Sequence, residues 1–247
     1  MNLATWESWY RHPKPQSVNY TRSIVSYLDI LGFRELIEKR TAGEVSRILR
    51  ILAESIAPHP TDEPVKIEFT KFSDTVIRST PEPSPAYFIY ELKTILRAQV
   101  ALIPEGVPIR GAVTIGEITQ SWDVVYGPAV VRAYELDSGP PRIVIDDKAL
   151  SLLRPPVDAN FLVELGLTRL EGTTVYLDYL KACEVELRVE DEEYLQFLEI
   201  HRDFIRRCLG KYAEKRGVLE KYEWLRTYHE RILQERFGSE IPPHLNV

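Results

Sequence analysis

The sequence predicts an α+β fold, and three observations support it. Residues 20–146 give the element order β-α-α-β-β-α-β-β-α-β when read by hydrophobic periodicity. Two of these strands are joined by a short turn, as in a β-hairpin. Residues 191–237 carry two long helical patterns. The order is that of a ferredoxin-like core with an added helix and an added hairpin arm. We therefore expect an antiparallel-rich sheet with helices on one face, followed by a C-terminal helical hairpin.

A strand and two helices begin the core. Residues 22–30 have the pattern of a buried strand, and helices are predicted over 32–39 and 42–57. A histidine and two prolines end the second helix. Apolar residues recur along that helix at helical spacing, namely Val45, Ile48, Ile51, Leu52 and Ile56.

A hairpin and a long helix follow. Apolar and polar residues alternate over 65–70, which is typical of a half-buried strand. Residues 72–75 form the predicted turn, and 75–79 the returning strand. After a proline-rich break, residues 86–102 form a long amphipathic helix.

The other core elements come in quick succession. We predict a strand over 107–119, a short strand over 122–126, a helix over 128–136 and a last strand over 143–145. Pro128 suits the first turn of its helix, where a missing N–H costs nothing.

The C-terminal part is less regular at first. Residues 146–187 predict only short strands and turns, whereas 191–216 and 218–237 predict two long helices broken at Gly217. A helical hairpin of this kind is usually a packing or dimerisation element.

Three segments result from these patterns. We expect residues 1–19 to form an N-terminal extension, with a short helix and a proline-containing linker. Residues 20–187 form the main domain, and residues 188–247 form a C-terminal helical appendage.

Composition excludes several classes of function. The chain has 247 residues and a formal net charge of -6, which disfavours binding to nucleic acid or to an anionic membrane. No apolar run approaches the roughly 20 residues of a membrane span, and the N-terminus lacks the pattern of a signal peptide. Two distant cysteines favour a reducing compartment, so we expect a cytoplasmic protein. The five histidines are scattered, which makes a histidine-rich metal site improbable.

Two carboxylates are candidates for metal ligands. Asp29 stands at the far end of the first strand, before a glycine turn and a helix, and Asp74 stands at the hairpin tip. Each alone is ordinary, since aspartate is common at strand ends and turns. If the first strand lies beside the hairpin, both occupy one edge of the sheet. Paired aspartates there can bind two divalent ions about 3.5–4 Å apart.

Four segments together resemble a known family. They are 29–33 (Asp-Ile-Leu-Gly-Phe), 72–74 (Phe-Ser-Asp), 110–117 (Arg-Gly-Ala-Val-Thr-Ile-Gly-Glu) and 126–129 (Tyr-Gly-Pro-Ala). Their order and spacing resemble the class III nucleotide cyclase domain over residues 20–146. The sequence is most similar to the bacterial pyrimidine cyclases of the Pycsar anti-phage systems, and the resemblance makes 20–187 a catalytic domain.

The resemblance implies a two-metal site. Asp29 and Asp74 match the metal-binding carboxylates of the family, and the Ile30 carbonyl matches a backbone ligand. The implied cofactor is a pair of divalent ions, Mn²⁺ or Mg²⁺.

It also implies how a triphosphate is held. Gly32 and Phe33 match the turn whose N–H groups contact the triphosphate, and Arg110 matches the basic residue that grips the phosphates. In the family, active sites lie in the interface of a head-to-tail homodimer.

The base-reading positions depart from those of purine cyclases. Thr70 stands four residues before the second aspartate, where purine cyclases have Lys or Glu, and Val124 stands near the position of Asp or Cys. A threonine hydroxyl can donate or accept and imposes no purine pattern. Purine edges would be left unpaired, which favours a pyrimidine substrate.

A second departure concerns the helix over 128–136. The Asn and Arg of purine cyclases fall on Val131 and Glu135. Arg132 is one residue away and is the candidate for stabilising transition-state charge; it could equally be a solvated helix residue. This departure is the best argument for a domain without catalytic activity.

We therefore predict a uridylate cyclase. It would convert UTP to 3′,5′-cyclic UMP and pyrophosphate, a second messenger for an effector in anti-phage defence. The alternatives are a cytidylate cyclase that makes cyclic CMP, a purine cyclase with unusual base contacts, and a non-catalytic cyclase-like regulator.

Overall fold

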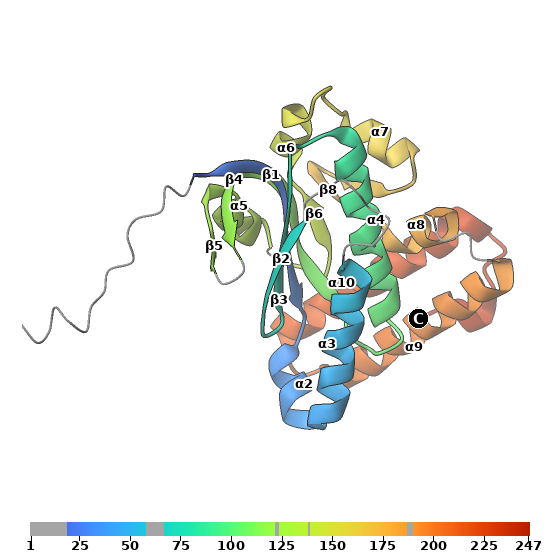
Figure 1. Ribbon diagram of the computed structural model, residues 1–247. Helices are drawn as coiled ribbons and strands as arrows, with labels where there is room; N and C mark the ends of the chain where they lie inside the picture. The colour runs from blue at the N-terminus through green and yellow to red at the C-terminus, as the bar shows by residue number, and fades with distance from the viewer. Residues whose placement is uncertain (1–18, 58–66, 122–123, 138, 187–189) are drawn as a thin grey trace, which may run out of the picture.

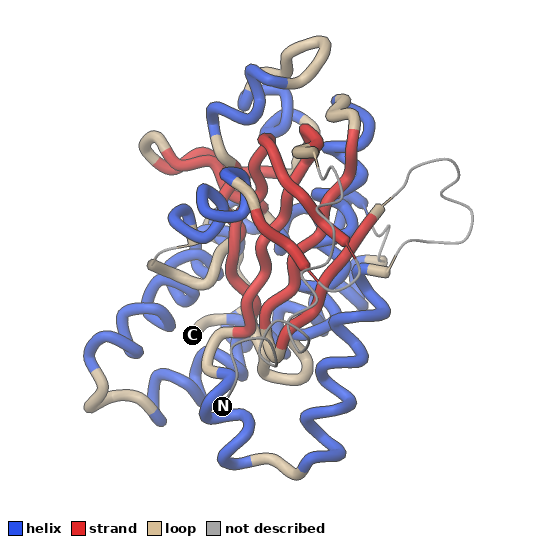
Figure 2. The backbone as a smooth tube through the Cα atoms, turned by 60° about the vertical axis from the view of Figure 1, so that its left-hand side comes forward, coloured by secondary structure: helices blue, strands red, loops and turns tan. Residues whose placement is uncertain are grey.

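A mixed sheet forms the centre of the protein (Figures 1 and 2). The computed structural model describes residues 19–57, 67–121, 124–137, 139–186 and 190–247. The strands are β1 (Thr21–Ile30), β2 (Glu68–Phe72), β3 (Thr75–Pro81), β4 (Ile109–Ser121), β5 (Val124–Tyr126), β6 (Ile143–Ile145), β7 (Thr168–Glu171) and β8 (Thr174–Leu177). Their order is β2-β3-β1-β4-β6-β8-β7, and β5 pairs with the end of β4.

The first four strands have the predicted ferredoxin-like arrangement. β1 is antiparallel to both β3 and β4, and β2 is antiparallel to β3. β6 then adds in parallel to β4, and β8 and β7 extend the sheet in antiparallel steps. The predicted α+β class and its antiparallel-rich sheet are confirmed.

Helices cover the two faces of this sheet unequally. The core helices are α2 (Phe33–Lys39), α3 (Ala42–Ile56), α4 (Pro85–Leu102) and α5 (Pro128–Leu136). Ile24 and Leu28 of β1 lie in one cluster with buried residues of α3 and α4, whereas Val25 lies in a second cluster with Ala129 of α5. We call these sides the α4 face and the α5 face. Figure 1 shows α3 and α4 on one side of β1 and α5 on the other, so α5 departs from the predicted one-sided arrangement.

Local sequence signals explain how α3 and α4 begin and why α5 packs closely on the sheet. Thr41 and Glu44 form a reciprocal capping box at the start of α3. The Ser84 side chain accepts from the Tyr87 N–H at the start of α4. α5 approaches β4 closely because the residue it meets there is Gly116.

The region after β6 is more helical than predicted. It contains α6 (Asp147–Leu152), α7 (Ala159–Glu164) and α8 (Tyr179–Glu186) as well as β7 and β8. The first two helices have six residues each, too few for a periodic pattern to emerge, but each has an aspartate N-cap.

The C-terminal hairpin is confirmed, with a shifted break. It consists of α9 (Asp191–Lys211) and α10 (Arg216–Phe237) and is followed by a 3-10 turn, η1 (Pro243–Leu245). Gly217 lies inside α10, since one helical glycine costs only about 1 kcal/mol. The chain reverses instead near Tyr212, whose ring stacks on Tyr222 of α10 at 5.3 Å between centroids.

The hairpin and the main domain share one hydrophobic cluster. It joins buried residues of α9 and α10 to those of α4, α8 and the sheet. The division at residue 188 remains a prediction about domains. Residues 1–18, most of the predicted extension, lie outside the described residues.

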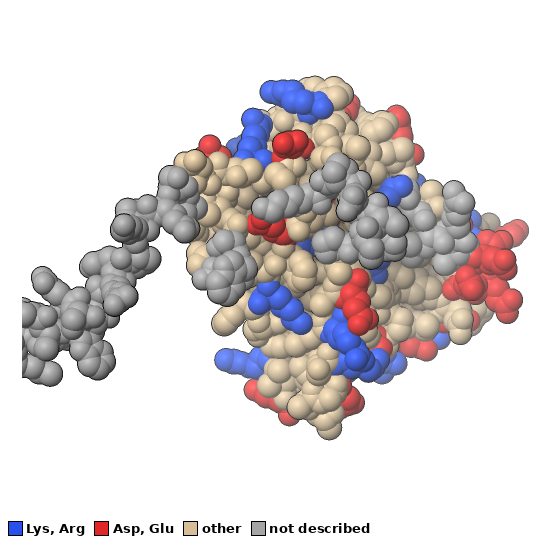
Figure 3. All heavy atoms as spheres, in the orientation of Figure 1, with Lys and Arg blue, Asp and Glu red and all other residues tan. Residues whose placement is uncertain are grey.

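Two surface properties bear on the composition argument. Within the described ranges, none of the helices combines the length and the apolar character that crossing a membrane requires. Figure 3 shows basic and acidic side chains interspersed on the face in view, rather than a surface of one sign.

A buried ion pair fixes β3 to α4. Arg78 Nε and Nη2 each lie 3.0 Å from a carboxylate oxygen of Glu91, and the two side chains are 0% and 1% exposed. Ser26 Oγ donates to the same carboxylate at 2.7 Å, and Arg78 also donates to the Ile56 carbonyl. The cluster therefore links β1, β3, α3 and α4.

Two buried histidines link α9 to α10. His229 Nε2 lies 3.0 Å from the Leu245 carbonyl, which can only accept, so Nε2 carries the proton. His229 Nδ1 then accepts from His201 Nδ1 at 3.1 Å. His201 Nε2 in turn accepts from the Tyr179 hydroxyl at 2.6 Å. In this arrangement both rings are neutral, which is the state that burial favours.

We expect this pair to make the protein sensitive to mild acid. Burial lowers the pKa of His201 and of His229, whereas an unfolded histidine titrates near pH 6.5. The unfolded state therefore binds more protons below that pH. Stability should be full above about pH 7 and fall by up to about 2.7 kcal/mol per pH unit below about 6.5.

Urea unfolding between pH 7 and 5.5, above the ordinary pKa values of aspartate and glutamate, measures this slope. A variant with both His201→Gln and His229→Gln should lose most of it. An unchanged slope in that variant would assign the acid sensitivity to other groups.

Candidate active site

The two predicted metal ligands are neighbours. Asp29 of β1 pairs with Thr75, the first residue of β3, so Asp74 in the preceding turn lies next to Asp29. Ser73 has a positive φ of 58°, which makes the turn tight. Both carboxylates therefore occupy the same end of the sheet, as predicted.

The electrostatics of Asp29 reflect this crowding. Burial is the main cause that raises the pKa of Asp29, and its hydrogen bond with Arg110 lowers it. The Asp74 carboxyl raises the pKa further, by its charge and by a hydrogen bond. A nearby cation would relieve this repulsion.

Arg110 lies between two carboxylates. It is paired with Asp29 across β1 and β4, and its Nε and Nη2 both lie 3.1 Å from Asp29 Oδ2. Its Nε is also 3.5 Å from Oδ2 of Asp137, a side chain only 4% exposed at the end of α5. The close approach of β4 to β1 requires glycine at position 111, because a Cβ at that position would lie 1.9 Å from the Tyr27 carbonyl oxygen.

Two charged residues were missed by sequence reasoning. Burial raises the pKa of Asp137, and Arg110 opposes that shift. Lys221 of α10 interacts electrostatically with Arg110, Asp137 and Asp29, while burial lowers its pKa. Asp137 directly follows the helix predicted over 128–136, so its place at that helix end could have been found, whereas no local signal connects Lys221 to a site so distant in sequence.

The turn after β1 has the predicted form. Gly32 is left-handed, with φ of 78°, and is the N-cap of α2, which begins at Phe33. The Leu31 N–H donates to the Pro108 carbonyl, and the first helical bond runs from Leu36 to Gly32. The first N–H groups of a helix have no acceptor within it. Ile30 extends one residue past the β1–β3 pairing.

The predicted base-reading residues also lie near each other. Thr70 Oγ1 on β2 accepts from Nε2 of Gln120 on β4 at 2.9 Å. Gln120 pairs with Val125 of β5, and Val124 pairs with the next residue of β4. The arm formed by β5 and the end of β4 therefore reaches β2. Thr70 lies opposite Tyr27 across β3, two residues from Asp29, which gives a distance of about 12 Å at 4.8 Å per strand and 3.3 Å per residue.

Arg132 lies apart from the aspartate pair. Its Nε and Nη2 lie 3.1 and 3.0 Å from the Asp146 carboxylate, which also accepts from Thr114 at 2.7 Å. Thr114 is four residues along β4 from Arg110, about 13 Å at strand spacing. The catalytic role of Arg132 stays a prediction, and this ion pair gives it a structural role.

The α5 region exposes several large apolar side chains. The exposed fraction is 82% for Phe72 at the hairpin tip, 64% for Tyr134, 58% for Val131 and 47% for Val124. These residues come from α5, β5 and the tip next to Asp74. Their number around one site is suited to a protein partner.

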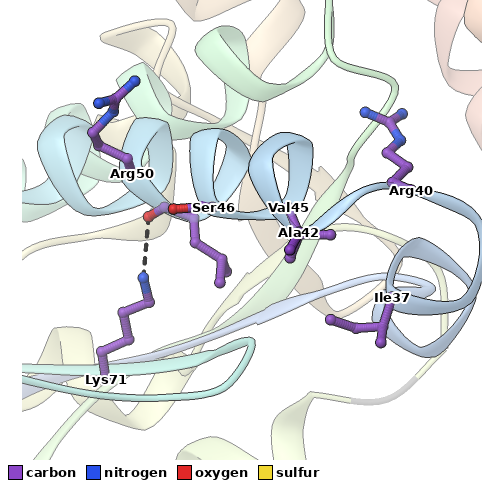
Figure 4. A pocket seen from close by; sticks show the side chains of 8 residues that line it. Ile37, Arg40, Ala42, Val45, Ser46, Arg50 and Lys71 are labelled. Atoms are coloured by element: carbon purple, nitrogen blue, oxygen red, sulfur yellow. Dashed lines mark hydrogen bonds between the residues drawn. The ribbon is translucent and has the colours of Figure 1, made fainter.

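A separate groove lies on the α4 face (Figure 4). It has a volume of about 530 Å³ and is lined by Ile37, Arg40, Ala42, Val45, Ser46, Leu49, Arg50 and Lys71. Lys71 donates to the Leu49 carbonyl at 3.2 Å across it. Lys71 pairs with Val76, whose side chain belongs to the α4-face cluster, so the groove and the aspartate pair use different faces.

The metal ligands that the aspartate pair and the adjacent backbone offer are oxygen atoms. Carboxylate and carbonyl oxygens are the ligands that Mg²⁺ and Mn²⁺ prefer. Within the described ranges, no group of three His, Cys, Asp or Glu side chains could hold one ion. The pair therefore fits a cation that takes its other ligands from backbone, water or substrate.

Comparison with solved structures finds several nucleotide cyclases. The chain is similar to the adenylyl cyclase CyaB from P. aeruginosa, with 17% identity and a TM-score of 0.42 over 66% of this chain and 95% of that one. It is also similar to the guanylyl cyclase Cya2, with 16% identity and a TM-score of 0.44 over 66% of this chain and 93% of that one. For the guanylate cyclase domain of RhGC from Catenaria anguillulae, in complex with GTP, these values are 16%, 0.41, 64% and 94%.

No protein-family model and no curated protein matches the sequence. At these TM-scores the structural likeness is loose, so the site is interpreted from its own residues.

Proposed function

We propose that the protein is a class III nucleotide cyclase that acts on a pyrimidine nucleoside triphosphate. The observation that carries the proposal is the adjacent pair Asp29 and Asp74, with Arg110 beside it, at one end of a ferredoxin-like sheet. Two acidic groups next to a cation suit a substrate that brings both metal ions and phosphates.

In this proposal Asp29, Asp74 and the Ile30 carbonyl would hold two Mn²⁺ or Mg²⁺ ions. Bound divalent ions of this kind lower the pKa of an attacking hydroxyl and neutralise charge on a leaving polyphosphate. The ribose 3′-hydroxyl would attack the α-phosphorus in line and pass its proton to water. A new P–O bond would close the ring, and pyrophosphate would leave with the electron pair of the broken bond. The carboxylates would position the reacting groups, since Asp29 on β1 pairs with Thr75 and Asp74 lies in the turn directly before Thr75.

Arg110 would turn from Asp29 toward the phosphates. Its contact with the buried Asp137 would keep the guanidinium at the site when a metal ion replaces it at Asp29. The turn at Gly32 and Phe33 offers backbone N–H groups to the same phosphates. Both kinds of contact are shared by all four ribonucleotides.

The base preference rests on Thr70 and Val124. Neither side chain supplies the charged partner that a purine edge needs in purine cyclases, and Val124 is apolar. We propose UTP as substrate and 3′,5′-cyclic UMP as product, a cytoplasmic second messenger that activates an effector in anti-phage defence. CTP and cyclic CMP are the nearest alternative.

Incubating the pure protein with each of the four ribonucleoside triphosphates and Mn²⁺ tests the proposal. Mass spectrometry should find a cyclic mononucleotide and pyrophosphate, with UTP the best substrate. A product only from ATP or GTP would contradict the pyrimidine assignment, and no product from any of them would favour the non-catalytic reading.

A non-catalytic regulator is the second candidate. The bidentate contact of Arg132 with Asp146 favours it, because that guanidinium is already occupied and the usual helix positions hold Val131 and Glu135. Such a protein would bind a nucleotide or a partner without turnover.

We also propose that the active unit is a head-to-tail homodimer. The exposed apolar residues around the site, such as Phe72 and Tyr134, support a second copy as the partner. In this arrangement the metal carboxylates and the base pocket come from opposite subunits.

Mixing two inactive variants should then restore activity. We expect an Asp74→Ala chain and a Thr70→Arg chain to form a heterodimer in which one site has both halves intact. The ceiling is about one active site in four at equal mixing with free exchange. The measurement is the cyclisation rate after mixing, with exchange followed by differently tagged chains. Exchange without any recovered activity would place each site within one chain.

A further inference from the structure

The amide of Gln120 has an orientation fixed by its neighbours. Its nitrogen lies 2.9 Å from Thr70 Oγ1 and 3.4 Å from the Ile77 carbonyl oxygen. A backbone carbonyl can only accept a hydrogen bond, so the NH₂ group, and not the amide oxygen, faces it. The oxygen Oε1 therefore points away from both of these partners.

That oxygen has no hydrogen-bond partner among the described residues, although it is buried. A buried acceptor left unpaired costs about 1–3 kcal/mol. The amide nitrogen is held by Thr70 of β2 and Ile77 of β3, and the backbone of Gln120 is paired with Val125 of β5. An acceptor held this firmly and left unpaired is suited to a ligand that supplies an N–H.

Thr70 adds a donor next to this acceptor. Its oxygen accepts from Gln120, which leaves the hydroxyl hydrogen free to point to another acceptor. The two side chains thus present one acceptor and one donor side by side. Uracil offers the complement in two ways, because its N3–H has a carbonyl oxygen on either side. Cytosine has no hydrogen on N3 and offers one such pair, its amino group with N3.

We propose that Gln120 is a specificity-determining residue that reads uracil, with Oε1 accepting from N3–H and the Thr70 hydroxyl donating to an adjacent carbonyl. The inference rests on the proposed function, since it places the base of the triphosphate at Thr70. Gln120 occupies neither of the two positions, those of Thr70 and Val124, at which purine cyclases read the base.

The test compares UTP with N3-methyl-UTP, in which a methyl group replaces the critical hydrogen. For the natural chain we expect kcat/KM to fall by roughly 5–150-fold on methylation, which corresponds to leaving one buried acceptor unpaired. In Gln120→Leu, activity on UTP should fall to a similar level, and the ratio between the two substrates should approach one. Binding of 3′-deoxy-UTP and its N3-methyl form gives the same comparison without turnover.

Gln99 provides a matched control. It lies in α4, and its Oε1 is likewise buried without a partner among the described residues, but it belongs to the α4 face. Gln99→Leu should leave the UTP to N3-methyl-UTP ratio as in the natural chain. Gln120→Met repeats the test with an unbranched side chain in case the leucine variant does not fold.

The outcomes separate the inference from the proposed function. If the natural chain cyclises UTP but the methylation penalty survives unchanged in both Gln120 variants, Gln120 does not read the base and the proposed function stands. If the natural chain neither binds nor cyclises any pyrimidine triphosphate, the proposed function fails and the inference fails with it.

Discussion

Asp29→Ala and Asp74→Ala should each reduce cyclisation by roughly 10³-fold or more, while the protein stays folded. Each carboxylate is proposed to hold both ions, so removing either one dismantles the site and forfeits several kcal/mol of transition-state stabilisation. The fold should tolerate both changes. In Asp29→Ala a half-buried carboxylate disappears, and Arg110 keeps its contact with Asp137. The measurement is the rate of product formation at saturating Mn²⁺.

The control for this prediction is Asp147→Ala in the first turn of α6, an aspartate outside the site. It should keep the natural rate. Substantial activity in either site variant, with metal dependence intact, would sink the two-metal assignment. Thermal unfolding of all three variants shows whether a loss of rate reflects a loss of fold.

Glu91→Ala is expected to have the largest effect on stability, a loss of about 3–5 kcal/mol. The substitution leaves the Arg78 guanidinium buried without its bidentate partner and removes the acceptor of Ser26. A charge in this environment costs far more than one at the surface. Urea unfolding of the natural chain and the variant measures the difference.

Glu105→Ala is the matched control, since it breaks an Arg–Glu pair with Arg47, whose side chain is 47% exposed. That loss should be about 0–1 kcal/mol. A chain with both Arg78→Met and Glu91→Leu should recover much of the stability, because no unpaired charge remains. Equal losses for Glu91→Ala and Glu105→Ala would show that burial does not govern the strength of these pairs.

The position of the aspartate pair could be predicted because it depends on short-range patterns. The hairpin turn fixes Asp74, the strand pattern fixes Asp29, and a ferredoxin-like order places their strands side by side. The position of Arg110 follows from the same strand order, because β4 pairs with the edge of β1 opposite to β3.

Other features depend on tertiary contacts that no local pattern encodes. Gln120 meets Thr70 only because the long strand β4 carries its far end and β5 over to β2. Lys221 reaches the site because α10 packs back on the main domain. Arg78 and Glu91 look like surface residues in sequence, and only the packing of β3 on α4 buries them.

Counting bound metal ions tests the central claim most directly. Electron paramagnetic resonance of Mn²⁺, titrated into the protein with 3′-deoxy-UTP, separates bound from free ion without requiring turnover. The account predicts two Mn²⁺ ions per subunit in the natural chain, and loss of the protein-dependent sites in Asp29→Asn and Asp74→Asn. The same number of bound ions in the natural chain and in both variants would contradict it.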